Sequence, residues 1–237
     1  MSRSTIPCML MRGGTSKGAY LLARDLPSTQ ADRDPLLLRI MGSPDVRQID
    51  GLGGATSLTS KMAIVSASVR DDRDVDFAFA QIGVETDTVD TGPTCGNILS
   101  GVGPFAILRG LVEAGQDETT VRVWDVNTSS RMDIVVSTPG GVVEYEGDAS
   151  IDGVPGTAAP ILINFLDILG PRSGTVFPTG NPRDEIEGVQ VTCVDSVNPV
   201  VLLHADELGE SGHEIPADLD ADHPMLERLE TIRRSAS

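Results

Sequence analysis

The chain has 237 residues, and its 35 aspartates and glutamates outnumber 18 lysines and arginines to give a formal net charge of −17. This charge argues against nucleic acid or an anionic membrane as a partner, because both would be repelled. Hydrophobic residues at 40% and charged residues at 22% are typical of a globular protein with a core, so disorder is not expected.

The first part of the chain predicts strands, glycine-rich turns and one short helix. Residues 6–26 carry short apolar runs on both sides of a glycine-rich turn, which predicts a strand, a turn and a strand. A helix is expected over 32–41, before the helix breakers Gly42 and Pro44. The next predicted elements are a polar, glycine-rich loop at 50–61 and strands at 62–66 and 75–82.

Residues 95–112 predict a largely buried helix. Their apolar positions follow a 3.6-residue period, with Pro93 and Thr94 as entry and capping residues. Cys95 would then lie in the first turn, where unpaired N–H groups and the helix dipole favour a thiolate and can hold an anion. Cys95 is therefore a candidate for proton transfer or nucleophilic attack, although free cysteines are more often small buried hydrophobes.

After Gly110 the chain returns to short strands separated by turns. A linker is expected at 151–160 and an amphipathic helix at 222–235. Strands are predicted at 119–126, 131–138, 141–147, 161–168, 189–195 and 199–205. Many short strands with one central buried helix indicate the α+β class.

The three cysteines, Cys8, Cys95 and Cys193, show no metal-ligand spacing and no disulfide framework. Cys8 and Cys193 lie in strand-like runs and are expected in the core. No apolar run approaches the roughly 20 residues of a membrane span, and no signal core is evident, so a cytoplasmic protein is expected. A Cys–His–Asn hydrolase remains an alternative, although the three histidines all come late in the chain.

Two glycine-rich loops resemble nucleotide-binding motifs only in part. Residues 13–18 lack the Lys-Ser/Thr pattern of a phosphate loop, and residues 51–54 lack the third glycine of a dinucleotide fingerprint. Tight turns account for both clusters, and a nest of N–H groups and hydroxyls for carboxylates is the functional alternative for 13–18. Lys61 follows the second loop and is either a solvated surface charge or a half-buried proton-transfer group.

Five segments, at 11–20, 50–61, 94–112, 152–161 and 194–201, resemble the family of 2-methylaconitate cis–trans isomerases and 4-oxalomesaconate tautomerases. The similarity runs essentially from end to end, and the VGPFAI sequence after the cysteine looks closer to the tautomerase branch. The resemblance implies the diaminopimelate-epimerase-like fold, in which two pseudo-symmetric lobes each curl a β-sheet around a central helix. It also implies a site in the cleft between the lobes, with no metal and no organic cofactor.

The family's pattern divides this chain into a first lobe at 1–155, with Lys61 and Cys95, and a second lobe at 156–237. Family members are considerably longer, so the second lobe is expected to be incomplete. An open lobe would leave sheet edges and apolar faces exposed and would favour pairing with another chain, so a homo-oligomer is possible.

The resemblance also assigns roles to individual residues. Lys61 and Cys95 fall where the family carries its proposed acid–base residues. Gly96 and Asn97 match the N–H groups that hold a substrate carboxylate in the epimerases, and Asn198 matches a second-lobe turn that presents an asparagine. The full set of implied substrate-binding residues is Thr15, Ser16, Gln81, Gly96, Asn97 and Asn198.

These assignments predict an isomerase that transfers a proton on a small unsaturated di- or tricarboxylate. Keto–enol tautomerisation of 4-oxalomesaconate is the leading reaction, and 2-methylaconitate cis–trans isomerisation is the nearest alternative. A non-catalytic or accessory member of the family is an alternative from another class. The sequence does not decide which of Lys61 and Cys95 is the base.

Overall fold

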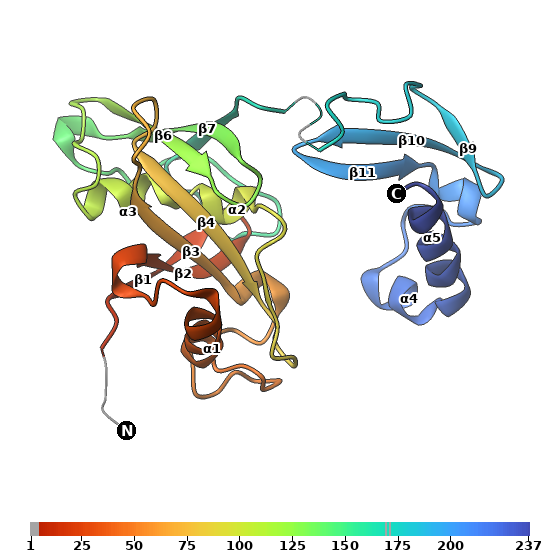
Figure 1. Ribbon diagram of the computed structural model, residues 1–237, viewed down its shortest axis with the longest axis horizontal. Coiled ribbons are helices and arrows are strands. Elements are labelled where there is room, and N and C mark those ends of the chain that lie inside the picture. The colour runs from red at the N-terminus through yellow and green to blue at the C-terminus, as the bar shows by residue number, and fades with distance from the viewer. Residues whose placement is uncertain (1–4, 169, 171) are drawn as a thin grey trace. The chain divides into compact units, whose positions relative to one another are not determined.

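The computed structural model describes residues 5–168, 170 and 172–237. The chain forms two compact units, an N-terminal unit that ends at Leu166 and a C-terminal unit that begins at Asp167 (Figure 1). The sequence places this boundary between residues 155 and 156. The unit boundary comes later because the strand β8 (Ile161–Phe165) pairs with the sheet of the N-terminal unit.

The N-terminal unit contains one eight-stranded mixed sheet in the order β1-β2-β3-β4-β6-β7-β8, with β5 paired to β4. Parallel pairing joins β2 to β3 and β4 to β6, and the other pairs are antiparallel. Besides β8, the strands are β1 (Cys8–Gly13), β2 (Ser16–Leu22), β3 (Lys61–Ala67), β4 (Val75–Ile82), β5 (Val89–Asp90), β6 (Glu118–Asp125) and β7 (Ser130–Ser137).

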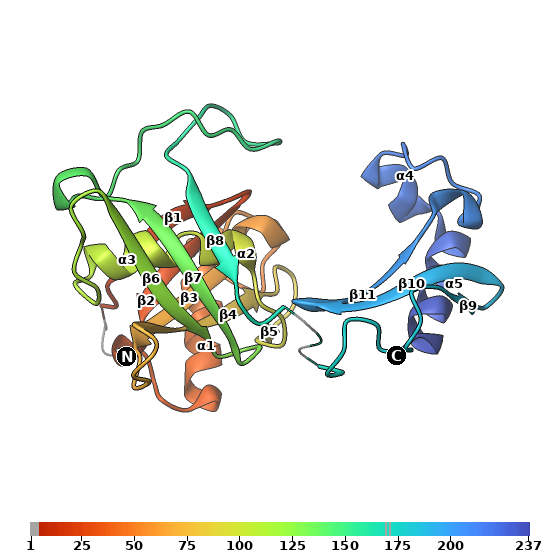
Figure 2. The ribbon, with the colours of Figure 1, turned by 90° about the horizontal axis from the view of Figure 1, so that it is seen from above.

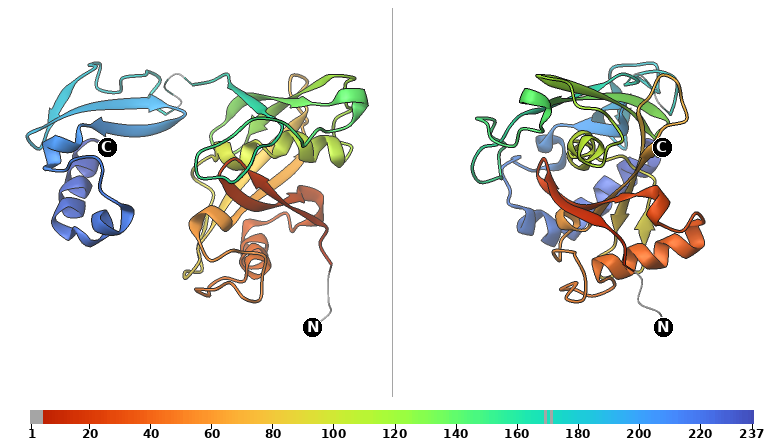
Figure 3. Two further views of the ribbon diagram at one scale, coloured as in Figure 1. Left: turned by 180° about the vertical axis from the view of Figure 1, so that it is seen from behind. Right: turned by 90° about the vertical axis from the view of Figure 1, so that its left-hand side faces the viewer.

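This sheet curls around two short helices, α2 (Gly96–Leu99) and α3 (Val102–Leu108). Figure 3 (right) shows the yellow-green helix end-on within the curve of the strands, and Figure 2 shows β6, β7 and β8 side by side over it. Buried residues of both helices join the inward-facing strand residues in one core. The curled α+β sheet around a central helix confirms the expected fold class for this unit.

The outer face of β2, β3 and β4 is covered by α1 (Gln30–Met41). Alternate residues of β2 make this possible, because Tyr20 faces the inner core while Leu21 faces Leu37 and Met41 of α1. Gly42 ends the helix in the left-handed conformation, at φ 82°, as the predicted stop at this glycine requires.

The predicted continuous helix over 95–112 is interrupted, so this prediction is wrong in detail. Pro104 has no N–H to donate to the carbonyl of Ser100, which removes one bond of the α-helical ladder. The N–H of Gly101 instead bonds to Ile98 O at 3.1 Å, a tighter turn that separates α2 from α3. The helix then ends at Leu108, before Gly110 at φ 70°.

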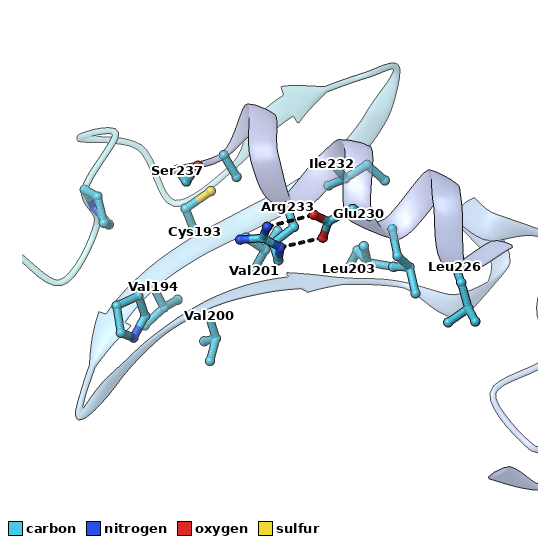
Figure 4. Close-up of a pocket in the computed structure, with 14 residues that line it drawn as sticks. Cys193, Val194, Val200, Val201, Leu203, Leu226, Glu230, Ile232, Arg233 and Ser237 are labelled. Atoms are coloured by element: carbon cyan, nitrogen blue, oxygen red, sulfur yellow. Dashed lines mark hydrogen bonds and ion pairs between the residues drawn. The ribbon is translucent and has the colours of Figure 1, made fainter. Parts of the chain in front are cut away.

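The C-terminal unit has a three-stranded antiparallel sheet in the order β11-β10-β9. Its elements are β9 (Asp184–Ile186), β10 (Val189–Ser196), β11 (Asn198–Leu203), α4 (Pro216–Ala221) and α5 (His223–Ser235). Ile232 of α5 packs on Val189, Val191 and Cys193 of β10 to form a small core. A groove of about 710 Å³ lies along α5 and this sheet, with the Glu230–Arg233 ion pair on its wall (Figure 4).

Most predicted strands are confirmed, but the one at 141–147 is wrong. Residues 139–141 form a short 3₁₀ turn, in which Gly140 and Gly141 have φ of 66° and 81°, and Val142 is exposed. The two left-handed glycines turn the chain away from the edge of the sheet. Cys8, expected in the core, is exposed on β1, whereas Cys193 is buried as expected.

Among the residues described, no helix is long and apolar enough to cross a membrane.

Candidate active site

The strand register gathers most of the predicted site at one end of the curled sheet. Gly18 pairs with Lys61, and Lys61 pairs with Gln81 on the other side. The turn between β1 and β2 lies at this same end, since Gly13 pairs with Ser16. The start of α2 lies at the same end of the sheet, because Asn97 of α2 is hydrogen-bonded to Thr15 in the β1–β2 turn.

Lys61 is half-buried and has a defined partner. Its Nζ donates to Oε1 of Gln81 at 2.8 Å and lies 5.2 Å from the centre of the Phe79 ring. The Gln81 amide nitrogen in turn donates to the carbonyls of Ser57 and Ser60, each at 3.1 Å. Lys61 is therefore positioned at the loop–strand junction, which fits the half-buried alternative better than a solvated surface charge.

Cys95 is half-buried and is the N-cap residue of α2, with extended backbone at φ −139° and ψ 102°. It packs against the core of the N-terminal unit. The expectation that Thr94 caps the helix is wrong. The Thr94 hydroxyl donates instead to Oδ2 of Asp125, a buried carboxylate at the end of β6.

The turn of residues 13–16 and Asn97 hold each other in place. The Thr15 N–H donates to Asn97 Oδ1 at 3.3 Å, and Asn97 Nδ2 donates to Thr15 Oγ1 at 3.0 Å. A Cβ at Gly13 would lie 2.3 Å from the Asn97 carbonyl oxygen, so only glycine permits this approach. Asn97 also lies in the first turn of α2, where backbone N–H groups have no acceptor within the helix.

Ser16 adds a hydroxyl group, and Gly96 adds a backbone N–H group without a helical partner, to the end of the sheet that carries Lys61. Ser16 is 2% exposed, and within the described part of the chain its Oγ has no hydrogen-bond partner. A buried hydroxyl without a partner is costly, so a ligand or water is the expected partner. Gly96 begins α2, and the first-turn N–H groups of a helix lack partners within the helix. A Cβ there would meet the Phe165 ring at 3.6 Å.

Asn198 lies in the C-terminal unit and is exposed at the start of β11. It directly follows Val197, whose φ of 61° makes the tight turn from β10. The structure therefore presents Asn198 at a hairpin turn, and its role toward the residues above stays a prediction.

Tyr20 and Asp125 are two buried polar residues that the sequence did not indicate as part of this region. The Tyr20 hydroxyl donates to Ile98 O at 2.7 Å, at the break between α2 and α3. Burial, followed by the charge of Cys95, raises the pKa of Tyr20, while a hydrogen bond from the Gly101 backbone lowers it. Tyr20 therefore stays a neutral donor that fixes the helix carrying Cys95.

A separate cavity of about 590 Å³ lies beside this end of the unit, next to Gly14. Its walls come from β1, the α2–α3 break and the loop 144–161, and they are mainly apolar. Within the described residues, no group of three or more histidine, cysteine, aspartate or glutamate side chains could hold a metal ion.

Comparison with known proteins places the chain among longer relatives. It is 56% identical over 233 residues to a 4-oxalomesaconate tautomerase from Pseudomonas putida, covering 98% of this chain and 64% of that protein. It is 39% identical to a 2-methyl-aconitate isomerase from Shewanella oneidensis, covering 94% of this chain and 61% of the relative. The chain therefore spans less than two thirds of the length of these curated relatives.

A solved structure gives the same result for the fold. The crystal structure of a methylitaconate-delta-isomerase matches with a TM-score of 0.80 and 45% identity, over 96% of this chain and 60% of the other. A family model described as PrpF protein matches residues 3–237. The motif resemblance is thereby confirmed, and the chain belongs to the PrpF protein family.

Proposed function

We propose that this chain is an isomerase that transfers a proton on a small unsaturated di- or tricarboxylate. The keto–enol tautomerisation of 4-oxalomesaconate is the leading reaction. The single observation that carries the proposal is the placement of Lys61, held by Gln81, at the end of the sheet where Cys95 is the N-cap residue of α2. The 56% identity to a 4-oxalomesaconate tautomerase supports this choice of substrate.

The proposed reaction needs two proton-transfer groups and a way to stabilise charge. One group removes a proton from a carbon next to a carbonyl, and the electron pair delocalises into the conjugated enolate. The other group returns a proton elsewhere along the conjugated system, so the substrate's composition is unchanged. Lys61 and Cys95 are the proposed pair, and the assignment of base and acid between them stays open.

The negative charges of the substrate and enolate require local donors, because the chain's net charge of −17 opposes anion binding. We propose that the backbone N–H groups of Gly96 and Asn97 and the hydroxyls of Thr15 and Ser16 are those donors. The unpartnered Ser16 Oγ supports this assignment. Asn198 is the proposed donor from the C-terminal unit.

The same groups suit the cis–trans isomerisation of 2-methylaconitate, because both reactions pass through a delocalised carbanion. The 39% identity to a 2-methyl-aconitate isomerase supports this second candidate. The three free cysteines fit a reducing compartment, and we propose that the protein acts in the cytoplasm.

The test is incubation of the purified chain with 4-oxalomesaconate or 2-methylaconitate in D2O, followed by proton NMR. Tautomerase function predicts rapid loss of substrate proton signal with 4-oxalomesaconate and slower loss with 2-methylaconitate. The reverse order would replace the leading substrate with the second. No exchange with either substrate, from protein with native circular dichroism, would favour a non-catalytic family member, and ester hydrolysis would favour a hydrolase.

A further inference from the structure

The loop that leads into Cys95 is attached, through the buried carboxylate of Asp125, to the turn between β6 and β7. Thr94 is 9% exposed, and its hydroxyl donates to Oδ2 of Asp125, which is 0% exposed. The other carboxylate oxygen, Oδ1, accepts from the backbone N–H groups of Asn127 at 2.8 Å and Thr128 at 3.3 Å. Asp125 therefore links the residue before Cys95 to the β6–β7 turn.

Asn127, in the same turn, bonds two further segments. Its Nδ2 donates to Thr91 O at 2.6 Å, which fixes the start of the loop that ends at Cys95. It also donates to Phe79 O at 2.9 Å, while its Oδ1 accepts from the Phe79 N–H at 2.8 Å. Backbone pairing of β4 with β6 covers only residues 75–77 of β4, so the Asn127 side chain continues the sheet by two hydrogen bonds.

Phe79 connects this turn to Lys61. Its ring centre lies 5.2 Å from Lys61 Nζ, a favourable distance for a cation above an aromatic face. Gln81, two residues further along β4, holds the same ammonium group. One turn therefore bonds both to the strand that supports Lys61 and to the loop that carries Cys95.

The hydrogen bonding of Asp125 fits a structural link rather than a proton-transfer group. Burial raises the pKa of this carboxyl, while hydrogen bonds from Thr94, Thr128 and Asn127 lower it. Its two carboxylate oxygens are both occupied by donors of the protein. These hydrogen bonds hold the Asp125 carboxylate within the protein, so we assign it no contact with the substrate.

We infer that Asp125 and Asn127 are positioning residues, which set the separation of Cys95 and Lys61 through Thr94, Thr91 and Phe79. The expected effect on turnover rests on the proposed function. The expected effect on the position of the Cys95 loop rests only on the hydrogen bonds above. A displacement of about 1 Å in a reacting group reduces turnover on the order of a hundredfold. Loss of a link is therefore expected to lower kcat far more than it changes KM.

The test uses Thr94→Val, which keeps the shape of the side chain and removes the hydroxyl, with Thr94→Ser as the conservative variant. Thr119→Val is the matched control, because Thr119 is a 6% exposed threonine of β6 that is hydrogen-bonded to Thr138 and Gly115. Asp125→Asn tests the other side of the link. Steady-state kinetics are combined with amide hydrogen exchange of the peptides that cover residues 91–99.

For Thr94→Val we expect kcat to fall roughly tenfold to a hundredfold with KM within about threefold of wild type. The Thr94→Ser variant should have a kcat within about fivefold of wild type, because serine keeps the hydroxyl. Exchange of residues 91–99 accelerates in Thr94→Val and stays at the wild-type rate in Thr119→Val. An equal loss of kcat in both valine variants, or no rescue by serine, would overturn the inference.

The exchange measurement keeps the inference separate from the proposed function. If wild-type protein turns over neither substrate, the proposed function fails, and the exchange data still decide whether the link holds the Cys95 loop. Wild-type exchange rates in both Thr94→Val and Asp125→Asn would overturn the link whatever the activity.

Discussion

The Lys61 ammonium group donates a 2.8 Å hydrogen bond to the side-chain oxygen of Gln81, its direct cross-strand neighbour. The orientation of the Gln81 amide is fixed from the other side, because its nitrogen donates to the carbonyls of Ser57 and Ser60. Oxygen is thus the atom that faces Lys61. Gln81 positions the lysine but leaves its positive charge unpaired by a negative one. A carboxylate in the same place would neutralise that charge.

Gln81→Leu should lower kcat while leaving the fold intact. A hydrogen bond to a charged group contributes about 1.5–3 kcal/mol, so we expect a loss of roughly tenfold to a hundredfold in kcat. Initial rates of proton exchange into the substrate measure this change. Gln190→Leu, an exposed glutamine of β10, is the control and should keep wild-type rates. Wild-type kcat in Gln81→Leu would show that Lys61 needs no such support.

Gly13→Ala should destabilise the N-terminal unit by about 1–3 kcal/mol, because the added methyl group is forced against close-packed neighbours. Its Cβ would lie 2.3 Å from Asn97 O and 2.7 Å from the Tyr20 hydroxyl. Urea denaturation followed by Trp124 fluorescence reports this unit, since the chain has one tryptophan. Gly96→Ala is the matched control, because its Cβ meets only the Phe165 ring at 3.6 Å. Equal stability of the two variants would contradict the close approach of the turn and α2.

Asp125→Asn should alter how the stability of the N-terminal unit depends on pH. Burial raises the pKa of Asp125 above its ordinary value of 3.8, so the folded state binds this proton more tightly than the unfolded state. The resulting stabilisation is present below pH 3.8 and is lost as pH rises through the higher folded value. The Asp125→Asn variant has a non-ionisable amide at this position and therefore lacks this pH-dependent contribution.

The free energy of unfolding of wild type minus that of Asp125→Asn should therefore decrease as pH rises above 3.8. Urea denaturation by Trp124 fluorescence at several pH values measures this difference. A difference that stays constant with pH, or increases, would contradict the burial of a titrating carboxyl at this position.

Ile232→Ala should destabilise the C-terminal unit by about 2–5 kcal/mol, the usual cost of a large-to-small change in a core. Ile232 is 1% exposed against β10, whereas Leu226 on the same helix is 40% exposed. Leu226→Ala is the matched control and should cost clearly less. Amide hydrogen exchange of β10 is the suitable measurement, because the tryptophan lies in the other unit. Equal effects would mean that α5 does not pack on β10 through Ile232.

The helices and strands follow from the sequence where a regular pattern meets a clear stop signal. The hairpin within residues 6–26 and the helix before Gly42 are examples. The pattern failed at 141–147, where alternating apolar residues follow two glycines that turn the chain away from the sheet. It failed again at Pro104, where apolar periodicity continues although the ladder of hydrogen bonds is broken.

Local sequence and family motifs single out Lys61 and Cys95, whose catalytic roles stay predictions, and the structure places Lys61 at a loop–strand junction and Cys95 at the start of the central helices. The link from Thr94 to Asp125 was not predictable, because the two residues are far apart in the sequence and meet only through the curl of the sheet. Thr94 before a helix has the pattern of a capping residue, and only its buried tertiary partner changes that assignment. Pairing of Asn127 with Phe79 is hidden for the same reason.

The measurement that tests the account most directly is deuterium incorporation into 4-oxalomesaconate by wild type, Cys95→Ala, Lys61→Met and Cys8→Ala. Cys8 is an exposed free cysteine of the same unit and controls for the loss of a thiol. We predict rapid incorporation by wild type and Cys8→Ala, and a loss of at least about a hundredfold in Cys95→Ala and in Lys61→Met. Wild-type rates in either of these two variants would contradict a proton-transfer pair at this end of the sheet.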